Sequence, residues 1–416
     1  MSGPVADSPH WGVLPGYALF AAVLSMAGLP LYIHAPKVYA DSYGLGLGVL
    51  GAVLFALRLL DVVQDPALGW VAARLGRWRG VAVAVAAAVM AGAMLGLFAV
   101  RPPIAPLVWF GLMMACLFTG FSFLTICFYA QGIRRATSLP GNGHLRLAAW
   151  RETGGLLGVC LAAVAPAVFM QWTQSPFDFF AVSFAGLVGI AVLAMAREWR
   201  AGGVVAPAGF GVILRDQAAR RFLVLALVNA APVAVSSTLF LFFVEARLAA
   251  PGWEGPLLVL FFLAAALSAP LWGRLAARFA PRRVLMAGMT LSILAFGGAL
   301  ALGPGDLVAF SVICLASGAA LGADMTLLPA LFARRVAHIS PEGAEAFGLW
   351  SFVGKLSLAL AAVVVLPMLE GAGFVSGAPI QTPAALEMLG VLYAGLPCGL
   401  KLIALGLLAF SDMTEG

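Results

Sequence analysis

The chain is dominated by apolar runs that are each long enough to cross a lipid bilayer. Six runs lie at about 13–34, 44–72, 80–100, 104–132, 147–170 and 177–196, and six more lie at about 218–245, 255–277, 283–302, 307–333, 344–369 and 387–410. Because 62% of the residues are hydrophobic and only 10% are charged, the composition excludes a soluble domain. The sequence therefore predicts an all-α integral membrane protein with twelve transmembrane helices.

Arginines gather in alternate loops between these runs. The loops after the second, fourth, sixth, eighth and tenth runs hold Arg74, Arg77, Arg79, Arg134, Arg135, Arg146, Arg197, Arg200, Arg215, Arg220, Arg221, Arg278, Arg282, Arg283, Arg334 and Arg335. By the positive-inside rule these loops and both termini face the cytoplasm. We therefore expect a multi-pass protein of a bacterial-type cytoplasmic (inner) membrane. The net charge of +6 then reflects orientation in the lipid bilayer, and no nucleic acid is expected as a partner.

The two groups of six runs also share a sequence repeat. The segment that follows the second run reads GWVAARLGRWR at 69–79, and the segment after the eighth reads GRLAARFAPRR at 273–283. A duplicated six-helix unit explains this, and such halves place a substrate between them near the membrane midplane. We expect an N-terminal bundle at 1–196, a cytoplasmic linker at 197–217 and a C-terminal bundle at 218–416.

Two aspartates lie deep within the second run. Asp61 and Asp65 are four residues apart and Arg58 precedes Asp61 by three, so all three share one face of a helix. Asp61 lies about 11 residues, or roughly 16 Å, from the helix end near residue 72. A carboxylate at that depth costs at least about 2.5 kcal/mol without a compensating partner. The pair predicts a site for a hard cation such as Na⁺, or for a proton. The alternative is that Arg58 only neutralises one aspartate in a packing pair.

Three further charges lie within apolar runs of the second half. Lys355 is about as deep as Asp61, and an intramembrane lysine requires an acidic partner. Asp61 or Asp65 is the expected partner, and Asp324 is the competing one. Lys401, in the last run, is expected to extend toward the inner membrane interface.

The repeated loop is similar to the signature of the major facilitator superfamily, G-x-x-x-D-R-x-G-R-[RK], with Ala73 and Ala277 at the position of the acid. Within that superfamily the chain resembles the glycoside-pentoside-hexuronide:cation symporters, typified by the melibiose permease. The segment from Arg58 to Gly69 is similar to their motif R-x-x-D-x-x-x-D-P-x-x-G. The segment from Ala346 to Lys355 is similar to a helix that ends in a buried lysine.

This resemblance implies the roles of specific side chains. The coupling cation would be bound by Asp61 and Asp65, with further oxygens from Ser122 and Thr125 on the fourth helix. The residues implied in solute binding are Arg58, Tyr129, Arg151, Trp350 and Lys355. For Arg151 the alternative is a salt bridge at the cytoplasmic end with neighbours of Glu152.

The resemblance also has departures that bear on the solute. Ser25 and Thr125 stand where related proteins carry acidic or amide side chains that bind sugar hydroxyls. Each hydrogen bond to a charged group contributes roughly 1.5 to 3 kcal/mol, so neutral galactosides should bind poorly. Because Arg151 and Lys355 remain, an anionic solute such as a hexuronide or another organic acid is the resulting hypothesis.

The sequence as a whole predicts a secondary active transporter that works by alternating access. We expect a symporter that couples Na⁺ or H⁺ to a sugar, glycoside, hexuronide or similar small polar solute. The alternative is a proton-coupled exporter of amphipathic compounds. We expect no enzymatic activity and no cofactor, because no nucleophile, base and acid converge and no metal-ligand spacing occurs. The two bundles of one chain contain a complete transport pathway, so we expect a monomer.

Overall fold

The computed structural model describes residues 14–200, 209–375 and 380–410, without the side chains at 29–33, 37, 41, 47, 48, 58 and 200. Within these ranges the regular structure is helical and contains no strand. The first half consists of α1 (Leu14–Met26), α2 (Leu29–Tyr43), α3 (Leu47–Arg74), η2 (Gly76–Trp78), α4 (Arg79–Phe98), α5 (Pro106–Ser138), α6 (Gly143–Phe169), α7 (Pro176–Ala194) and α8 (Ala196–Arg200). The second half consists of α9 (Phe210–Arg215), α10 (Gln217–Phe242), η3 (Phe243–Arg247), α11 (Glu254–Arg278), α12 (Pro281–Gly297), η4 (Gly298–Ala301), α13 (Leu307–Ile339), α14 (Ala344–Gly371), α15 (Pro383–Gly390), η5 (Val391–Gly395) and α16 (Leu396–Phe410).

The number of membrane spans agrees with the prediction of twelve. In the described part of the chain, ten helical segments are long and apolar enough to cross a bilayer, and α3, with 28 residues, is also long enough. The twelfth span is formed by α1 and α2 together. It differs from the expected run at 13–34, because the helix is interrupted at 27–28 and α2 then continues through Pro36 to Tyr43. Pro30 lies in the first turn of α2, where its missing N–H is tolerated.

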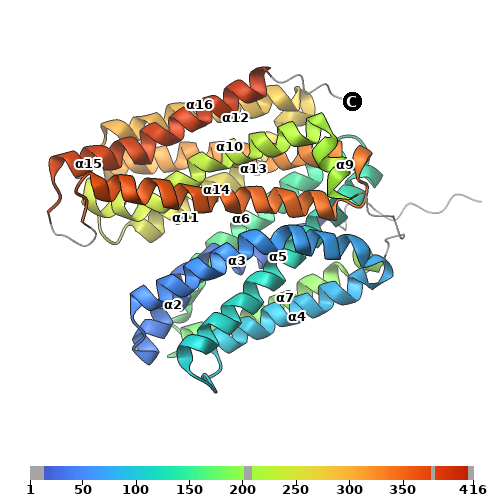
Figure 1. Cartoon of the computed structure of the whole chain (residues 1–416), viewed down its shortest axis with the longest axis horizontal. Coiled ribbons are helices and arrows are strands. Elements are labelled where there is room, and N and C mark those ends of the chain that lie inside the picture. The colour runs from blue at the N-terminus through green and yellow to red at the C-terminus, as the bar shows by residue number, and fades with distance from the viewer. Residues whose placement is uncertain (1–13, 201–208, 376–379, 411–416) are drawn as a thin grey trace, which may run out of the picture.

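The helices pack into two bundles (Figure 1). In the first half α1 packs on α6 and α7, while α4 packs on α5 and α7. In the second half α13 packs on α11 and α12, while α10 packs on α14 and α16. Small residues allow the closest contacts: a Cβ at Gly154 of α6 would lie 2.1 Å from the carbonyl oxygen of Ala18 in α1. Close backbone approach of this kind is the usual way that membrane helices associate.

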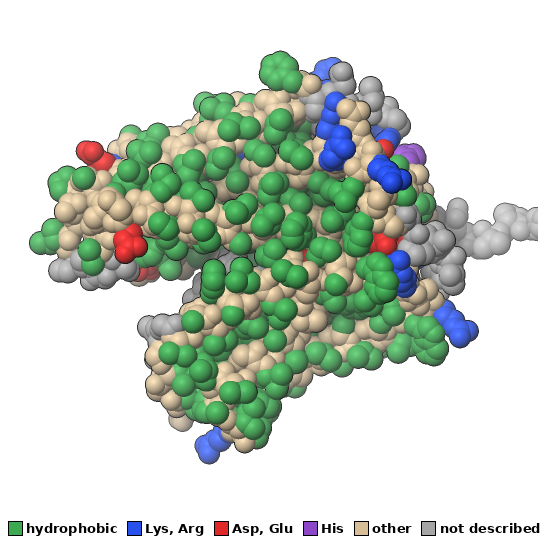
Figure 2. Space-filling view, in the orientation of Figure 1, with side chains coloured by type: hydrophobic (Ala, Val, Ile, Leu, Met, Phe, Trp, Pro, Cys, Tyr) green, Lys and Arg blue, Asp and Glu red, His purple; other side chains and the backbone are tan. Residues whose placement is uncertain are grey.

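Besides the contact of α6 with α11 farther along, at Cys160 and Val259, the two bundles are joined at one end. There α3 contacts α14 and α6 contacts α11, and one hydrophobic cluster combines Ile133 and Leu145 of the first half with Phe332 and Phe347 of the second. Figure 2 shows the bundles separated by a cleft at the opposite end, whereas most of the visible Lys and Arg side chains lie at the joined end. We call the joined end, which carries Arg79, the arginine-rich end. The cleft therefore opens away from it.

Candidate functional site

The predicted acidic side chains lie on the face of α3 that is turned toward α5 and α14. Asp65 is fully buried and Asp61 is 6% exposed. Gln64 lies on the same face, and its Nε2 donates to Oδ1 of Asp61 at 2.8 Å. Its own carbonyl oxygen accepts from the Thr119 hydroxyl of α5 at 3.0 Å. The Asp61 carboxylate is thus held in place by side chains from two helices of the first half.

Lys355 joins these carboxylates from the second half. Its Nζ lies 2.7 Å from Oδ1 of Asp61 and 2.9 Å from Oδ1 of Asp65. It also donates to Oγ of Ser122 at 2.6 Å, and that hydroxyl in turn donates to Asp61 at 2.9 Å. The ammonium therefore donates hydrogen bonds to Asp65 and Ser122 and forms an ion pair with Asp61. We call Asp61, Asp65, Ser122 and Lys355 the central cluster, and it connects the two halves of the molecule.

The central cluster retains capacity for one more positive charge. Two ionised carboxylates and one ammonium leave a net charge of −1. The Oδ2 atom of Asp65 and the Oγ1 atom of Thr125 are buried and have no hydrogen-bond partner. Unpaired buried oxygens are costly, and carboxylate and hydroxyl oxygens suit hard cations or, for the carboxylate, a proton. Thr125 follows Ser122 by three residues on α5, so it lies on the same side of that helix.

Lys355 has the partners that the sequence predicts, and the competing partner, Asp324, is wrong. Asp324 does not pair with Lys355, because its Oδ2 accepts from Nζ of Lys401. Lys401 also does not extend to the membrane interface: it is 2% exposed and donates to Oδ1 of Asn229 at 2.7 Å. The reason is helix packing. Since α16 lies against α10 and α12, the face of α16 that carries Lys401 points into the second bundle.

The candidate solute residues lie between the central cluster and the arginine-rich end. Arg151 is buried, and its Nε donates to Oε1 of Glu152 at 2.8 Å. The Tyr129 hydroxyl donates to the same oxygen at 3.1 Å, and the guanidinium lies 3.7 Å above the Tyr129 ring. The Trp350 ring stacks on Phe332 with centroids 4.7 Å apart. In this conformation these side chains are packed against one another, and the side chain of Arg58 lies outside the described residues.

Two acids at the arginine-rich end were not predicted. Glu342 pairs with Arg79, and both are nearly fully buried. Glu342 also lies 3.7 Å from Arg134. Glu345, at the start of α14, lies 3.4 Å from Arg74 and accepts from the backbone N–H of Gly209 at 2.6 Å. The ion pairs that join the halves therefore take their acids from the segment after α13, which compensates for Ala73 and Ala277 at the positions of the usual acid.

Two helical bundles joined at one end around a buried charge cluster define a membrane transporter with the major facilitator fold. The chain belongs to the family described as MFS/sugar transport protein, which matches residues 14–415. Proteins of this superfamily are membrane transporters and not enzymes. Among curated proteins, none matches the chain by sequence.

Solved structures share the fold over nearly the whole chain. The bacterial homologue of the iron transporter ferroportin, in an outward-facing state, is 13% identical with a TM-score of 0.72, and the match covers 97% of this chain and 99% of the other. The human organic anion transporter MFSD10 (TETRAN) is 17% identical with a TM-score of 0.65, covering 97% and 100%. The fucose:proton symporter FucP (N162A) of E. coli is 12% identical with a TM-score of 0.64, covering 95% and 98%. At these identities the likeness concerns the fold alone.

Proposed function

We propose that the protein is a cation-coupled symporter of a small polar solute, with Na⁺ or H⁺ as the coupling ion. The observation that carries this proposal is the pairing of Lys355, from the second half, with both Asp61 and Asp65, from the first. A buried cluster with a net charge of −1 between two moving halves is the arrangement that a bound cation would stabilise. A cation would compensate the second carboxylate without displacing the first ion pair.

Coupling follows from the charge on Lys355. When a cation or a proton neutralises an aspartate, the ammonium is held less strongly by the carboxylates and becomes available to an acceptor on the solute. The solute and the cation then share a binding free energy, so that each raises the affinity for the other. Closure of the two halves over an occupied site without net charge costs less free energy than closure over an unpaired buried charge.

The sidedness of the cleft is compatible with the proposed uptake. If the arginine-rich end faces the cytoplasm, as the positive-inside rule predicts, the structure represents an outward-open conformation. Solute and cation would then enter from outside and be released when the arginine-rich end separates. Both termini would be cytoplasmic, and the protein would lie in a bacterial-type inner membrane as a monomer.

An anionic solute is the proposed substrate class, such as a hexuronide or another organic acid. Its carboxylate could accept from Lys355, and opening of the Arg151–Glu152 pair would offer a bidentate donor. One of the solved structures with this fold is named as an organic anion transporter and another as a fucose:proton symporter. Both are compatible with a polar cavity between the halves.

The test is the thermal stability of the purified protein with and without Na⁺, at two pH values, against neutral glycosides, uronates and organic acids. We expect Na⁺ to raise the apparent melting temperature, Asp61→Asn to abolish that effect, and uronates or organic acids to add to it. Glu370→Gln, at an exposed acid on α14, is the matched control and should respond as the wild type does. If the melting temperature responds to pH but not to Na⁺, the coupling ion is H⁺ and not Na⁺. In proteoliposomes, an inward cation gradient that drives solute out would favour the exporter instead.

A further inference from the structure

A second buried charge cluster lies wholly within the second half. Asp324 of α13, Lys401 of α16 and Asn229 of α10 are each at most 6% exposed. The Lys401 ammonium donates to Asp324 and, at 2.7 Å, to Asn229. Asp324 lies near the middle of α13, so this cluster is also at membrane depth. The central cluster and its proposed cation do not involve any of these three side chains.

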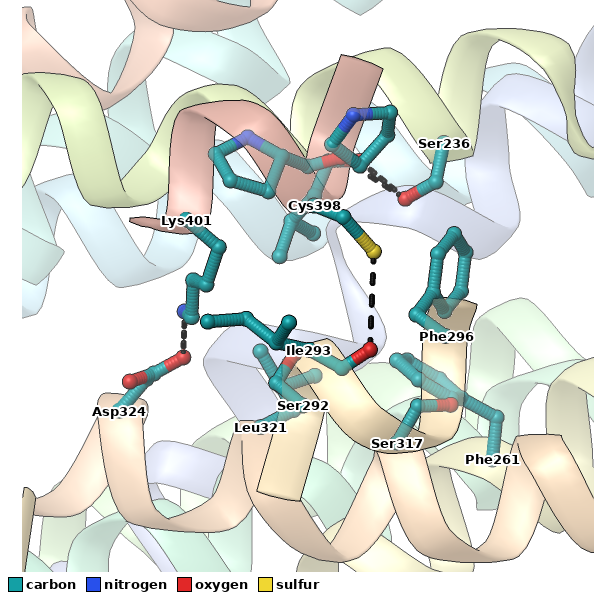
Figure 3. A pocket seen from close by; sticks show the side chains of 13 residues that line it. Ser236, Phe261, Ser292, Ile293, Phe296, Ser317, Leu321, Asp324, Cys398 and Lys401 are labelled. Carbon is teal, nitrogen blue, oxygen red and sulfur yellow. Dashed lines mark hydrogen bonds and ion pairs between the residues drawn. The ribbon is translucent and has the colours of Figure 1, made fainter. Parts of the chain in front are cut away.

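The pair lies at the wall of a cavity of about 40 Å³ among α10, α11, α12, α13 and α16 (Figure 3). Polar side chains line it, including Ser236, Ser292, Ser317 and Cys398. A water molecule needs about 10 to 15 Å³ of such volume and two to four polar partners. The cavity is therefore large enough for up to about three water molecules next to the Asp324–Lys401 pair.

The Asp324–Lys401 pair lacks one of the hydrogen bonds that would be expected if its role were only structural. The Oδ1 atom of Asp324 is buried and has no hydrogen-bond partner. A buried ion pair rarely adds net stability compared with apolar side chains of similar size, and an incompletely bonded one is less favourable still. Ionisable residues inside a membrane usually serve proton or ion movement. Asp324 therefore has one oxygen that is free to form a bond.

The helices allow the pair to separate. The Lys401–Asn229 bond lies within the closely packed pair of α10 and α16, whereas the Lys401–Asp324 bond crosses to α13, which packs mainly on α11 and α12. Pro232 of α10 and Pro397 of α16 both line the cavity. Proline removes a helical hydrogen bond and permits bending. A shift of α16 with α10 would keep Lys401 bonded to Asn229 and leave the carboxylate alone.

We propose that Asp324 is the proton-accepting group of a second ion site, separate from the central cluster. A hydronium ion in the cavity transfers its proton to the carboxylate, an O–H bond forms on Asp324, and a water molecule remains. Lys401 keeps its charge and is held by Asn229. The ligand is a proton and not a metal cation, because Asp324 is the one carboxylate among the described side chains that line this cavity and Lys401 already balances its charge, whereas the central cluster has a second carboxylate. This inference goes beyond the proposed symport and does not depend on it.

Asp324 is the carboxylate among the described side chains that line this cavity. Among the described residues, the titratable side chains that line the cavity are Asp324, Cys398 and Lys401, and the Cys398 thiol donates to the carbonyl of Ile293. The other titratable residues on the helices that pack against α13 and α16 do not line the cavity. In the first half these are Cys116, Cys127, Tyr129, Arg134 and Arg135 on α5, and His144, Arg146, Arg151, Glu152 and Cys160 on α6. In the second half they are Arg215 on α9, Arg220 and Arg221 on α10, Glu254, Arg274 and Arg278 on α11, Arg282 and Arg283 on α12, and Tyr393 on η5. On α13 itself the remaining ones are Cys314, Arg334, Arg335 and His338.

Infrared difference spectroscopy of the purified full-length protein, titrated from mildly acidic to neutral pH, measures this protonation directly. We expect a carboxylic-acid C=O band that grows as the pH falls and that persists in Asp61→Asn/Asp65→Asn. The part of the band that belongs to Asp324 should be missing in Asp324→Asn, so that the band is weaker than in the wild type. Since that variant leaves a buried lysine unpaired, Asp324→Asn/Lys401→Met, which removes both charges, provides a version of the site without net charge. A carboxylic-acid band of equal intensity in this double variant and in the wild type would overturn the proposal.

Two further variants make the result specific. Lys401→Met should shift the Asp324 band to higher pH, because the carboxylate loses the cation that favours its ionised form. Glu370→Gln, at an exposed position, should leave the band unchanged. If Lys401→Met leaves the titration of the band where it is in the wild type, the band does not belong to a carboxyl paired with Lys401 and the proposal is wrong. Because no step of this test measures transport, its outcome is independent of whether Na⁺-coupled uptake is found.

Discussion

Gly69 of α3 and Gly348 of α14 meet backbone to backbone across the two halves. A Cβ on Gly69 would lie 3.2 Å from the Cα of Gly348 and 2.9 Å from the carbonyl oxygen of Ala344. These contacts lie one turn from Asp65, whose carbonyl oxygen would be 2.9 Å from a Cβ on Gly348. The joined end of the molecule is therefore continuous with the central cluster, and separation of the halves at this point must move Lys355 relative to Asp65.

The first prediction concerns this contact. Gly69→Ala should destabilise the closed arginine-rich end, because a methyl group has no space against rigid backbone and overpacking costs about 1 to 3 kcal/mol. We expect a lower apparent melting temperature and slower solute uptake. Gly51→Ala, on the same helix with nothing within 4 Å of the new Cβ, is the control. Equal behaviour of the two variants would contradict the close contact between the halves.

The second prediction concerns the buried pair of Arg79 and Glu342, which joins the halves at the same end. Glu342→Gln should destabilise the protein by about 3 to 5 kcal/mol, because it leaves a buried arginine without its counter-charge. Arg79→Gln/Glu342→Gln should recover part of that loss. Thermal unfolding of the two single variants and the double variant gives the coupling energy. Losses that simply add would show that the two residues do not interact.

The third prediction concerns Lys355. Lys355→Met removes the only ammonium that contacts Asp61 and Asp65 in the described part of the chain. Two unpaired buried carboxylates should lower stability by about 3 to 5 kcal/mol without a cation. Na⁺ or acidic pH should then stabilise the variant more than the wild type, since either compensates the negative charge. Melting curves across Na⁺ concentrations would measure this, and an equal response of both proteins would argue against a cation site at the aspartates.

The sequence allowed the fold to be predicted from its apolar runs, and the center of the site for a separate physical reason. Burying a charge in a membrane is so costly that Asp61, Asp65 and Lys355, at similar depth, required one another or a cation. The same reasoning could not decide which charges pair. Asp324 joins Lys401 because α16 turns that lysine into the bundle, and rotation of a helix is set by packing. Gln64 and Thr119 were overlooked, although each lies three residues from a predicted ligand on the same helix face.

The acids of the arginine-rich end show a second limit of prediction from the sequence. In the superfamily signature the acid lies inside the repeated loop, at the position that Ala73 and Ala277 occupy in this chain. Glu342 and Glu345 come from the other half of the chain, and Glu345 follows Arg74 by 271 residues in sequence order. No local pattern relates residues so distant, and only the joined bundles bring them together.

The last prediction is a pH dependence at the start of α10. The Asp216 carboxylate accepts from Nη2 of Arg335 at 2.5 Å and from its Nε at 3.1 Å, and this arginine holds the pKa of Asp216 below its ordinary value. A carboxyl whose pKa is lowered by folding stabilises the protein above its unfolded pKa, which is about 3.9, and loses that contribution as the pH falls through the folded value. Asp216→Asn should therefore be less stable than the wild type near neutral pH, and the difference should vanish in strong acid.

Asparagine separates the charge of Asp216 from its second role. The side chain also accepts from the backbone N–H of Ala219 at 2.8 Å and caps α10, and asparagine caps as well as aspartate does. Asp216→Ala should lose about 1 kcal/mol more at every pH, because it removes the cap too. Melting temperatures of the two variants from neutral to acidic pH test both statements. A stability difference between wild type and Asp216→Asn that stays constant over the whole pH range would show that the Arg335 pair contributes no charge-dependent stability.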